Sequence, residues 1–307
     1  MGAKGMGRAR LQRLAAILIA AVGLAPAPSF GQAPSDAAAA RALFDKAVAL
    51  GDGGRTEDAI AVYNELVTRF GDASDLTLRE VVADALRKKG SALGQLGRSE
   101  DAIAIYDEVV ARVGTAPELS LREAASDALL RKAVTLGGLG RNEEAIAAYD
   151  EVTTRFGSAP ELTMLVNVGA ALYNKGATLE KLGRREASIA TYNDLIARLG
   201  DESDGSLREL TARALFNKGV ALYKLGRHNE EIAAYDDLIE RAGTASEKLL
   251  RELVAEALFN KGDTLNRLGQ SNAAKAAYND LIARFSSAAE PDLARIVQMA
   301  KRRLLKR

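Results

Sequence analysis

Hydrophobic positions along this chain return every three or four residues, which is the spacing of amphipathic helices. One long stripe consists of Leu250, Leu253, Val254, Ala257, Leu258, Leu265 and Leu268. A shorter stripe consists of Ile232, Tyr235, Leu238 and Ile239, and it follows the dipeptide Gly226-Arg227. Since glycine is typical of tight turns, the pattern predicts a longer helix of about 22 residues and a shorter helix, joined antiparallel through a Gly-Arg turn.

This helix pair is repeated six times along the chain. The Gly-Arg dipeptide begins at Gly54, Gly97, Gly140, Gly183 and Gly226, and Gly269-Gln270 takes its place in the last copy. Tyrosines stand at Tyr63, Tyr106, Tyr149, Tyr192, Tyr235 and Tyr278, and both series keep an interval of 43 residues. A fixed period of this size is typical of stacked supersecondary units, so we expect an all-α solenoid of six antiparallel helix pairs.

The ends of the shorter helices also carry signals. We expect Thr56, Ser99 and Asn142 to be N-caps, because their side chains can accept a backbone N–H, and acidic pairs follow them where the helix dipole favours negative charge. The helices are expected to end at Gly71, Gly114, Gly157, Gly200 and Gly243, because glycine is preferred just beyond a helix C-terminus.

The two ends of the array differ from its middle, as the caps of a solenoid should. Residues 35–42 open the first long helix. A last helix is expected over about 291–305, with an apolar face of Leu293, Ile296, Val297, Ala300 and Leu304. This C-terminal capping helix would cover the open core of the sixth repeat.

The first 33 residues have the three parts of a secretory signal peptide. Four basic residues precede an apolar run over residues 14–25, and Gly31-Gln32-Ala33 offers a cleavage site after Ala33. An uncleaved membrane anchor is the less favoured interpretation, because a spanning helix needs about 20 apolar residues. We therefore divide the chain into a signal peptide, residues 1–33, and a repeat domain, residues 34–307. The location expected for the mature chain, which has no predicted transmembrane segment, is periplasmic or secreted.

The segment Ala214–Arg227, followed by Ile232 and Tyr235, resembles the tetratricopeptide repeat family. Small residues of the longer helix match at Gly90, Gly176, Gly219 and Gly262, and those of the shorter helix at Ala59, Ala102 and Ala145. The resemblance covers about residues 36–300 and implies a right-handed superhelical solenoid that binds a protein or peptide partner in its concave groove. The 43-residue period exceeds the usual 34, and glycine replaces the family's closing proline. HEAT or armadillo repeats share the longer period but fit the Gly-Arg turn less well.

Residues that are present in every copy serve what every copy does, which is packing. Leucine stands at Leu43, Leu86, Leu129, Leu172, Leu215 and Leu258. Lysine stands at Lys46, Lys89, Lys132, Lys175, Lys218 and Lys261, and arginine at Arg69, Arg112, Arg155, Arg198, Arg241 and Arg284. A row of lysines could bind an anion, but a lysine stem that covers apolar surface and meets a carboxylate is the favoured interpretation.

Residues that vary between copies are free to serve a partner. The candidate groove residues are Tyr173, Asn174, Phe216, Asn217, Tyr223, Phe259 and Asn260. The resemblance implies that these positions line the concave face of the solenoid. In members of the family, asparagines at such positions hold the backbone of an extended peptide. The alternative is that the aromatic rings are buried between repeats and the asparagines are ordinary polar surface. The family's C-terminal carboxylate clamp lacks its asparagine here.

Composition excludes several classes of function. The chain has no cysteine and one histidine, so it offers no ligand cluster for a transition metal, and no motif predicts a cofactor. Without residues 1–33, 38 Lys and Arg stand against 41 Asp and Glu, a net charge of −3, which does not favour nucleic-acid binding. No catalytic motif is found, so a non-enzymatic scaffold is expected and a hydrolase is less favoured.

The C-terminus suggests an alternative function. It carries the basic residues Lys301, Arg302, Arg303, Lys306 and Arg307. This basic tail could attach an envelope component to membrane or lipopolysaccharide, and such a component could also self-associate into a homo-oligomer. Cations at a helix C-terminus also complement the helix dipole without any further function, which is the favoured interpretation.

Overall fold

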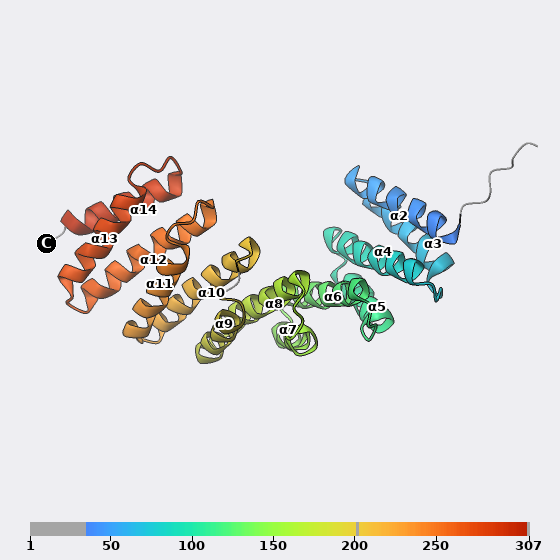
Figure 1. Ribbon diagram of the computed structural model, residues 1–307, viewed down its shortest axis with the longest axis horizontal. Coiled ribbons are helices and arrows are strands. Elements are labelled where there is room, and N and C mark those ends of the chain that lie inside the picture. Colours follow the sequence, from blue (N-terminus) through green and yellow to red (C-terminus); the bar gives the residue numbers. More distant parts are fainter. Residues whose placement is uncertain (1–34, 201–202, 306–307) are drawn as a thin grey trace, which may run out of the picture.

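The computed structural model describes residues 35–200 and 203–305, and within these ranges every regular element is an α-helix (Figure 1). The helices are α2 (Asp36–Asp52), α3 (Thr56–Phe70), α4 (Leu76–Gln95), α5 (Ser99–Val113), α6 (Leu119–Gly138), α7 (Asn142–Phe156), α8 (Leu162–Lys181), α9 (Arg185–Leu199), α10 (Gly205–Lys224), α11 (His228–Ala242), α12 (Lys248–Arg267), α13 (Ser271–Phe285) and α14 (Pro291–Leu305). Repeats 1 to 6 are the successive pairs α2–α3 to α12–α13. The predicted all-α solenoid is confirmed.

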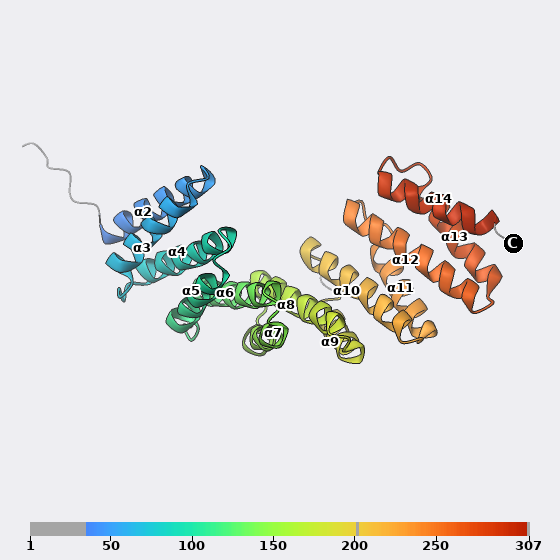
Figure 2. The same ribbon diagram turned by 180° about the vertical axis from the view of Figure 1, so that it is seen from behind.

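The long helices set the curvature of the solenoid. The backbones of successive long helices approach one another closely from α2 through to α14, whereas within the described residues the backbones of successive short helices do not. The repeats are therefore packed more closely on the side of the long helices, and this side becomes the inner surface. Figures 1 and 2 show the resulting arc, with α6 and α8 on its inner side and α7 and α9 on its outer side.

The long helices α4, α6, α8, α10 and α12 have 20 residues each and α2 has 17, so the expected length of about 22 was slightly too great. The last residues of the predicted helix belong to the turn instead. In that turn the six glycines that begin the Gly-Arg and Gly-Gln dipeptides have φ between 71° and 77°. This left-handed conformation is the one in which glycine replaces other residues at little steric cost.

The predicted N-caps of the short helices are wrong. Thr56, Ser99 and Asn142 are the first helical residues, and the capping position belongs to the preceding arginine, which makes no side-chain bond to the backbone. The guanidinium instead reaches the acidic residue three positions on, for example from Arg98 Nε to Asp101 Oδ2 at 2.8 Å. An ion pair in the first turn thus takes the place of a hydroxyl or amide cap.

The glycines that end the short helices have a different role from the expected one. Gly114 has φ −64° and ψ −18°, which is right-handed and open to any residue. Its carbonyl oxygen accepts a hydrogen bond from Arg155 of the next repeat, and a Cβ on Gly114 would lie 2.4 Å from that guanidinium and 2.4 Å from the carbonyl oxygen of Val110. Glycine therefore fits this position because a backbone carbonyl and an arginine together occupy the space of a side chain. Repeat 6, the last repeat of the described residues, has Ser286 at this position.

The invariant tyrosines close each helix pair. Gly219 of α10 lies under the ring of Tyr235 of α11, and a Cβ there would be 2.5 Å from the ring. The glycines of α4, α8 and α12 at this position make the same contact with Tyr106, Tyr192 and Tyr278. All six tyrosines and most of the invariant leucines are buried, as expected of framework residues. Leu43 in the first described repeat is only partly buried.

The capping helix α14 is confirmed over Pro291–Leu305 and buries Leu293, Ile296, Val297 and Ala300 against the sixth repeat. It stands where the long helix of a seventh repeat would begin. At the position of the invariant leucine, however, α14 has the exposed Lys301. Within the described residues no short helix packs over α14 at this position, so the side chain there meets solvent.

The predicted signal peptide and its cleavage site after Ala33 lie outside the described residues. Within the described residues, none of the helices combines the length and the apolar character that crossing a membrane requires.

Candidate partner-binding groove

Grooves recur on the inner surface, between the long helices of neighbouring repeats. We call the one between α10 and α12 the repeat 5–6 groove, and its floor is formed by α11. It is lined by Val220, Tyr223, Lys224, Glu231, Tyr235, Asn260, Asp263, Thr264 and Arg267. Its volume is about 360 Å³, against about 140 Å³ for the equivalent groove between α2 and α4. The grooves thus differ in size and lining although the backbone repeats.

Three of the four predicted aromatic groove residues belong largely to the framework. Phe259 is buried, and Tyr173 and Phe216 are half-buried. Each ring packs on the invariant tyrosine of its own repeat, with centroids 5.9–6.3 Å apart. This is the tilted contact that aromatic pairs favour. Only Tyr223 is exposed, at 39% of its surface, and it lines the repeat 5–6 groove.

The predicted asparagine ladder contacts the framework as well. Asn217 donates through Nδ2 to the hydroxyl of Tyr173 at 3.2 Å and to that of Tyr192 at 3.4 Å. Asn260 donates to Tyr235 Oη at 3.5 Å. Both contacts cross from one repeat to the previous one. Each amide keeps its oxygen as an acceptor for a ligand, and Asn174, Asn217 and Asn260 all remain half-buried on the inner surface.

A connected set of side chains distinguishes the repeat 5–6 groove from the others. Glu231 Oε1 accepts a hydrogen bond from Thr264 Oγ1 at 2.7 Å, and Glu231 Oε2 lies 3.1 Å from His228 Nδ1. The His228 ring lies beside Tyr223 at a centroid distance of 5.8 Å. The guanidinium of Arg267 also packs on Tyr223, with its Cζ 4.7 Å from the ring centre. The set joins α10, α11 and α12.

Glu231 was not singled out from the sequence, and it is the most unusual residue of this groove. It is 1% exposed, and its position in α11 holds a small residue in every other repeat. These residues are Ala59, Ala102, Ala145, Ser188 and Ala274. Comparison of the six copies at this position would have revealed it. His228, expected to be a surface turn residue, is half-buried as the partner of Glu231.

Acidic groups at the neighbouring repeat boundaries have resident cations. Glu180 of α8 pairs with Lys224 Nζ at 2.7 Å and lies 3.4 Å from Arg185 Nε. Asp263 of α12 receives both Nε and Nη2 of Arg303 at 2.8 Å. Arg303, predicted as part of the basic tail, is therefore tied to the framework. Lys301 and Arg302 are exposed, while Lys306 and Arg307 lie outside the described residues.

The rows of invariant cations serve the framework as predicted. Lys132 pairs with Asp107 at 2.6 Å and Lys175 with Asp150 at 2.5 Å, and Lys261 pairs with Asp236. Burial lowers the pKa of Lys89 and Lys218, whose stems cover apolar surface. These lysines do not form a free anion track.

Burial also raises the pKa of the tyrosine hydroxyls under the grooves. It raises the pKa of Tyr149 and of Tyr192 to about 12, since the phenolate would lose its hydration there. The pKa of Tyr235 is raised as well, first by burial and then by the charge of Glu231. These hydroxyls therefore stay protonated, and they are suited to hydrogen bonding rather than to acid–base chemistry at neutral pH.

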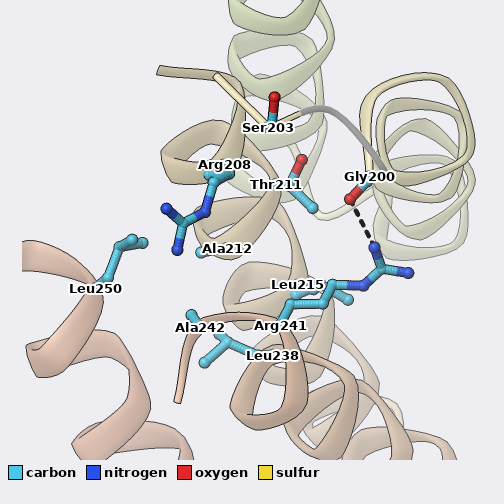
Figure 3. A pocket seen from close by; sticks show the side chains of 10 residues that line it. All are labelled: Gly200, Ser203, Arg208, Thr211, Ala212, Leu215, Leu238, Arg241, Ala242 and Leu250. Carbon is cyan, nitrogen blue, oxygen red and sulfur yellow. Dashed lines mark hydrogen bonds between the residues drawn. The ribbon is translucent and has the colours of Figure 1, made fainter. Parts of the chain in front are cut away.

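A second cavity of about 370 Å³ lies at the opposite end of α10, near Thr211, Leu238 and Leu250 (Figure 3). Arg241 crosses it to reach the carbonyl oxygen of Gly200, as the dashed line in Figure 3 shows. The same arrangement recurs three repeats earlier around Val82 and Arg112. Because it repeats with the framework, we assign this cavity to repeat packing. Within the described residues, no cluster of three potential metal ligands is found.

Comparison with known proteins agrees with the repeat architecture. A family model described as tetratricopeptide repeat matches residues 18–75, 46–117, 87–160, 130–206 and 173–247, and a second model of the same description matches residues 256–288. Among solved structures, BtubC from P. vanneervenii is 13% identical, with a TM-score of 0.54 over 88% of this chain and 93% of that chain. The apo form of RapI is 11% identical, with a TM-score of 0.52 over 88% and 100%. A comparison with curated proteins finds no match.

Proposed function

Because the chain belongs to the tetratricopeptide repeat family, we propose that it is a non-enzymatic scaffold that holds an extended protein segment along its inner surface. Repeat solenoids of this kind use an extended concave surface for binding. Proteins of this family mediate protein–protein interactions, and the structural relatives share the fold.

One observation carries the proposal: residues common to all copies make the framework, while the varied residues face the inner surface of repeats 4 to 6. At the last turn of the long helices, repeats 1 to 3 have Gly51, Gly94 and Gly137. Repeats 4 to 6 have Glu180, Tyr223 and Asn266 at the same position. Side chains able to recognise a partner are therefore gathered in the C-terminal half of the groove.

The middle of the inner surface is suited to an uncharged stretch of a partner. Val134, Ala177 and Val220 occupy the same position in successive long helices; Val134 is 47% exposed, and Ala177 and Val220 are half-buried. Apolar side chains that remain accessible on a surface can mark interaction sites. The asparagines beside them retain free carbonyl oxygens for the backbone N–H groups of a peptide.

We place this activity in the bacterial periplasm or outside the cell. The support is the basic and apolar pattern of residues 1–33, which is that of a signal peptide. Cell fractionation and N-terminal sequencing of the mature protein test this placement. Recovery of the intact N-terminus from the cytoplasmic fraction would contradict it.

In-cell photocrosslinking tests the scaffold role. A photoreactive amino acid is introduced at Val134 or Val220 on the inner surface, and at the exposed Ala111 of α5 as the control. We expect the inner positions, and not Ala111, to capture the same partner, which mass spectrometry then identifies. Equal capture of a partner at all three positions, or no capture at the inner positions, would contradict the proposal.

A further inference from the structure

The repeat 5–6 groove has a buried carboxylate that no lysine or arginine of the described residues pairs with. Glu231 is 1% exposed, and its partners are the hydroxyl of Thr264 and the imidazole of His228. An ionised carboxylate is costly to bury without a compensating positive charge. The five other repeats avoid this cost by having alanine or serine at the position.

The adjacent groove, between α12 and α14, shows how this chain compensates such a charge. There the guanidinium of Arg303 lies on the carboxylate of Asp263 with two hydrogen bonds of 2.8 Å. It also lies 5.7 Å from the ring centre of Phe259, and Tyr278 donates its hydroxyl to the same carboxylate. A carboxylate, an aromatic ring and a tyrosine hydroxyl therefore already form one cation site.

The repeat 5–6 groove has the same kinds of group but lacks the cation. Asn260 stands at the position of Arg303 and is too short to reach across, so the groove stays open. The floor holds Glu231 and the hydroxyl of Tyr235, and the wall holds the exposed ring of Tyr223. The resident cations at its rim are engaged, since Lys224 pairs with Glu180 and Arg267 rests on Tyr223.

We infer that the repeat 5–6 groove receives a lysine or arginine side chain of the bound protein segment, with Glu231 as the carboxylate that holds it. This inference rests on the proposed scaffold function and adds the chemistry of one residue of the partner. The incoming cation replaces the hydrogen bond of His228, which stands at the solvent end of the pair with 24% of its side chain exposed. Tyr223 flanks the aliphatic stem of the entering residue.

The test uses the full mature chain and two capped pentapeptides, Gly-Gly-Arg-Gly-Gly and its counterpart with citrulline in place of arginine. Citrulline keeps the length and the planar end of arginine but is uncharged. Binding is followed by chemical-shift changes of the amides of Tyr223 and Thr264. We expect the citrulline peptide to bind about tenfold more weakly than the arginine peptide, because it cannot compensate the carboxylate.

Two substitutions at Glu231 and one control complete the experiment. Glu231→Gln and Glu231→Ala should each abolish the preference for arginine, and alanine is already the native residue in four repeats. Glu240→Gln is the matched control, because Glu240 is an exposed carboxylate on the same helix and the change in net charge is the same. It should leave the preference intact.

Three results would overturn the inference: equal binding of both peptides, no shift at Tyr223 and Thr264, or a preference that survives Glu231→Gln. The crosslinking experiment separates this failure from failure of the scaffold proposal. The crosslinker at Val134 or Val220 is used in the unmodified chain and in a chain that also has Glu231→Ala. If both chains capture the same partner equally well, the scaffold role stands and the cation site does not.

Discussion

Arg155 donates a hydrogen bond from Nη2 to the carbonyl oxygen of Gly114, 2.6 Å away, across the boundary between the second and third repeats. The same bond recurs from Arg112 to Gly71, from Arg198 to Gly157, from Arg241 to Gly200 and from Arg284 to Gly243. The last carbonyl groups of a helix lack partners within that helix. Each short helix is therefore completed by the repeat that follows it, which couples neighbouring repeats in addition to their apolar contacts.

This coupling can be tested at Arg155. We expect Arg155→Ala to lower the free energy of unfolding by about 1–2 kcal/mol, because a carbonyl loses a charged donor. Gly114→Ala should also be destabilising, since its Cβ would lie 2.4 Å from the guanidinium of Arg155 and 2.4 Å from the carbonyl oxygen of Val110. Urea unfolding followed by circular dichroism measures both. Ser286→Ala, at the same position of the last repeat, is the control and should change little; equal losses for Ser286→Ala and Gly114→Ala would contradict the explanation.

Two glycines in long helices should respond in opposite directions to alanine. Gly219→Ala places a methyl group 2.5 Å from the ring of Tyr235 and should destabilise the protein by about 1–3 kcal/mol. Gly94 of α4 has open space around its Cβ position, so Gly94→Ala should stabilise it by about 0.5–1 kcal/mol through better helix propensity. Thermal unfolding of both variants checks this, and a stabilised Gly219→Ala protein would be incompatible with the packing described.

Alkaline pH should destabilise the protein partly through Tyr149. Burial raises the pKa of this tyrosine from 10.0 to about 12, so between these values the folded state keeps a proton that the unfolded state loses. Stability must then fall as pH rises through this window. Urea unfolding at a series of pH values from neutrality to 12 should show a shallower fall for Tyr149→Phe. Parallel curves for the two proteins would exclude a contribution from Tyr149.

The architecture was accessible from the sequence because it rests on short-range regularities. The apolar stripes, the Gly-Arg turns and the six tyrosines repeat without interruption, and each constrains residues close to it in the chain. The helix pairs and the capping helix followed from them. The caps of the short helices were predicted incorrectly because hydroxyl and amide caps were assumed. In fact arginine precedes five of the six short helices, and in repeats 1, 2, 3 and 5 it pairs with an acidic residue within the first turn.

The candidate site was harder to predict because its contacts connect distant residues. Asn217 and Tyr173 are 44 positions apart, so their hydrogen bond could not be seen in any single repeat. The same holds for Glu231 and Thr264, which are 33 positions apart. Whether Phe259 is exposed depends on the tilt of its helix against the next one. Tyr223 and Asn260 line the repeat 5–6 groove, while Phe259 is buried.

The buried carboxylate should cost stability. We expect Glu231→Ala to raise the free energy of unfolding by about 1 kcal/mol, because it removes a buried carboxylate whose described partners are a hydroxyl and an imidazole and not a lysine or arginine. Ser188→Ala, at the same position of repeat 4, is the control; it removes a hydroxyl that donates to the carbonyl oxygen of Gly176 and should lower stability instead. Thermal unfolding measures both. A Glu231→Ala protein that is clearly less stable would indicate that Glu231 serves to lock repeats 5 and 6 together.

The last prediction concerns the open end of the solenoid. Lys301 and Arg302 of α14 stand where repeat 6 has Leu258 and Phe259, and both are exposed. Restoring the apolar residues with Lys301→Leu and Arg302→Phe should leave the monomer folded but create an apolar patch on α14, since both positions are exposed in the described structure. We expect concentration-dependent association in sedimentation experiments. The matched variant Lys301→Gln, Arg302→Gln removes the same charges without adding apolar surface and should stay in the state of the unmodified chain. Association of the glutamine variant would show instead that charge repulsion, and not the lack of apolar surface, keeps this end apart from other copies.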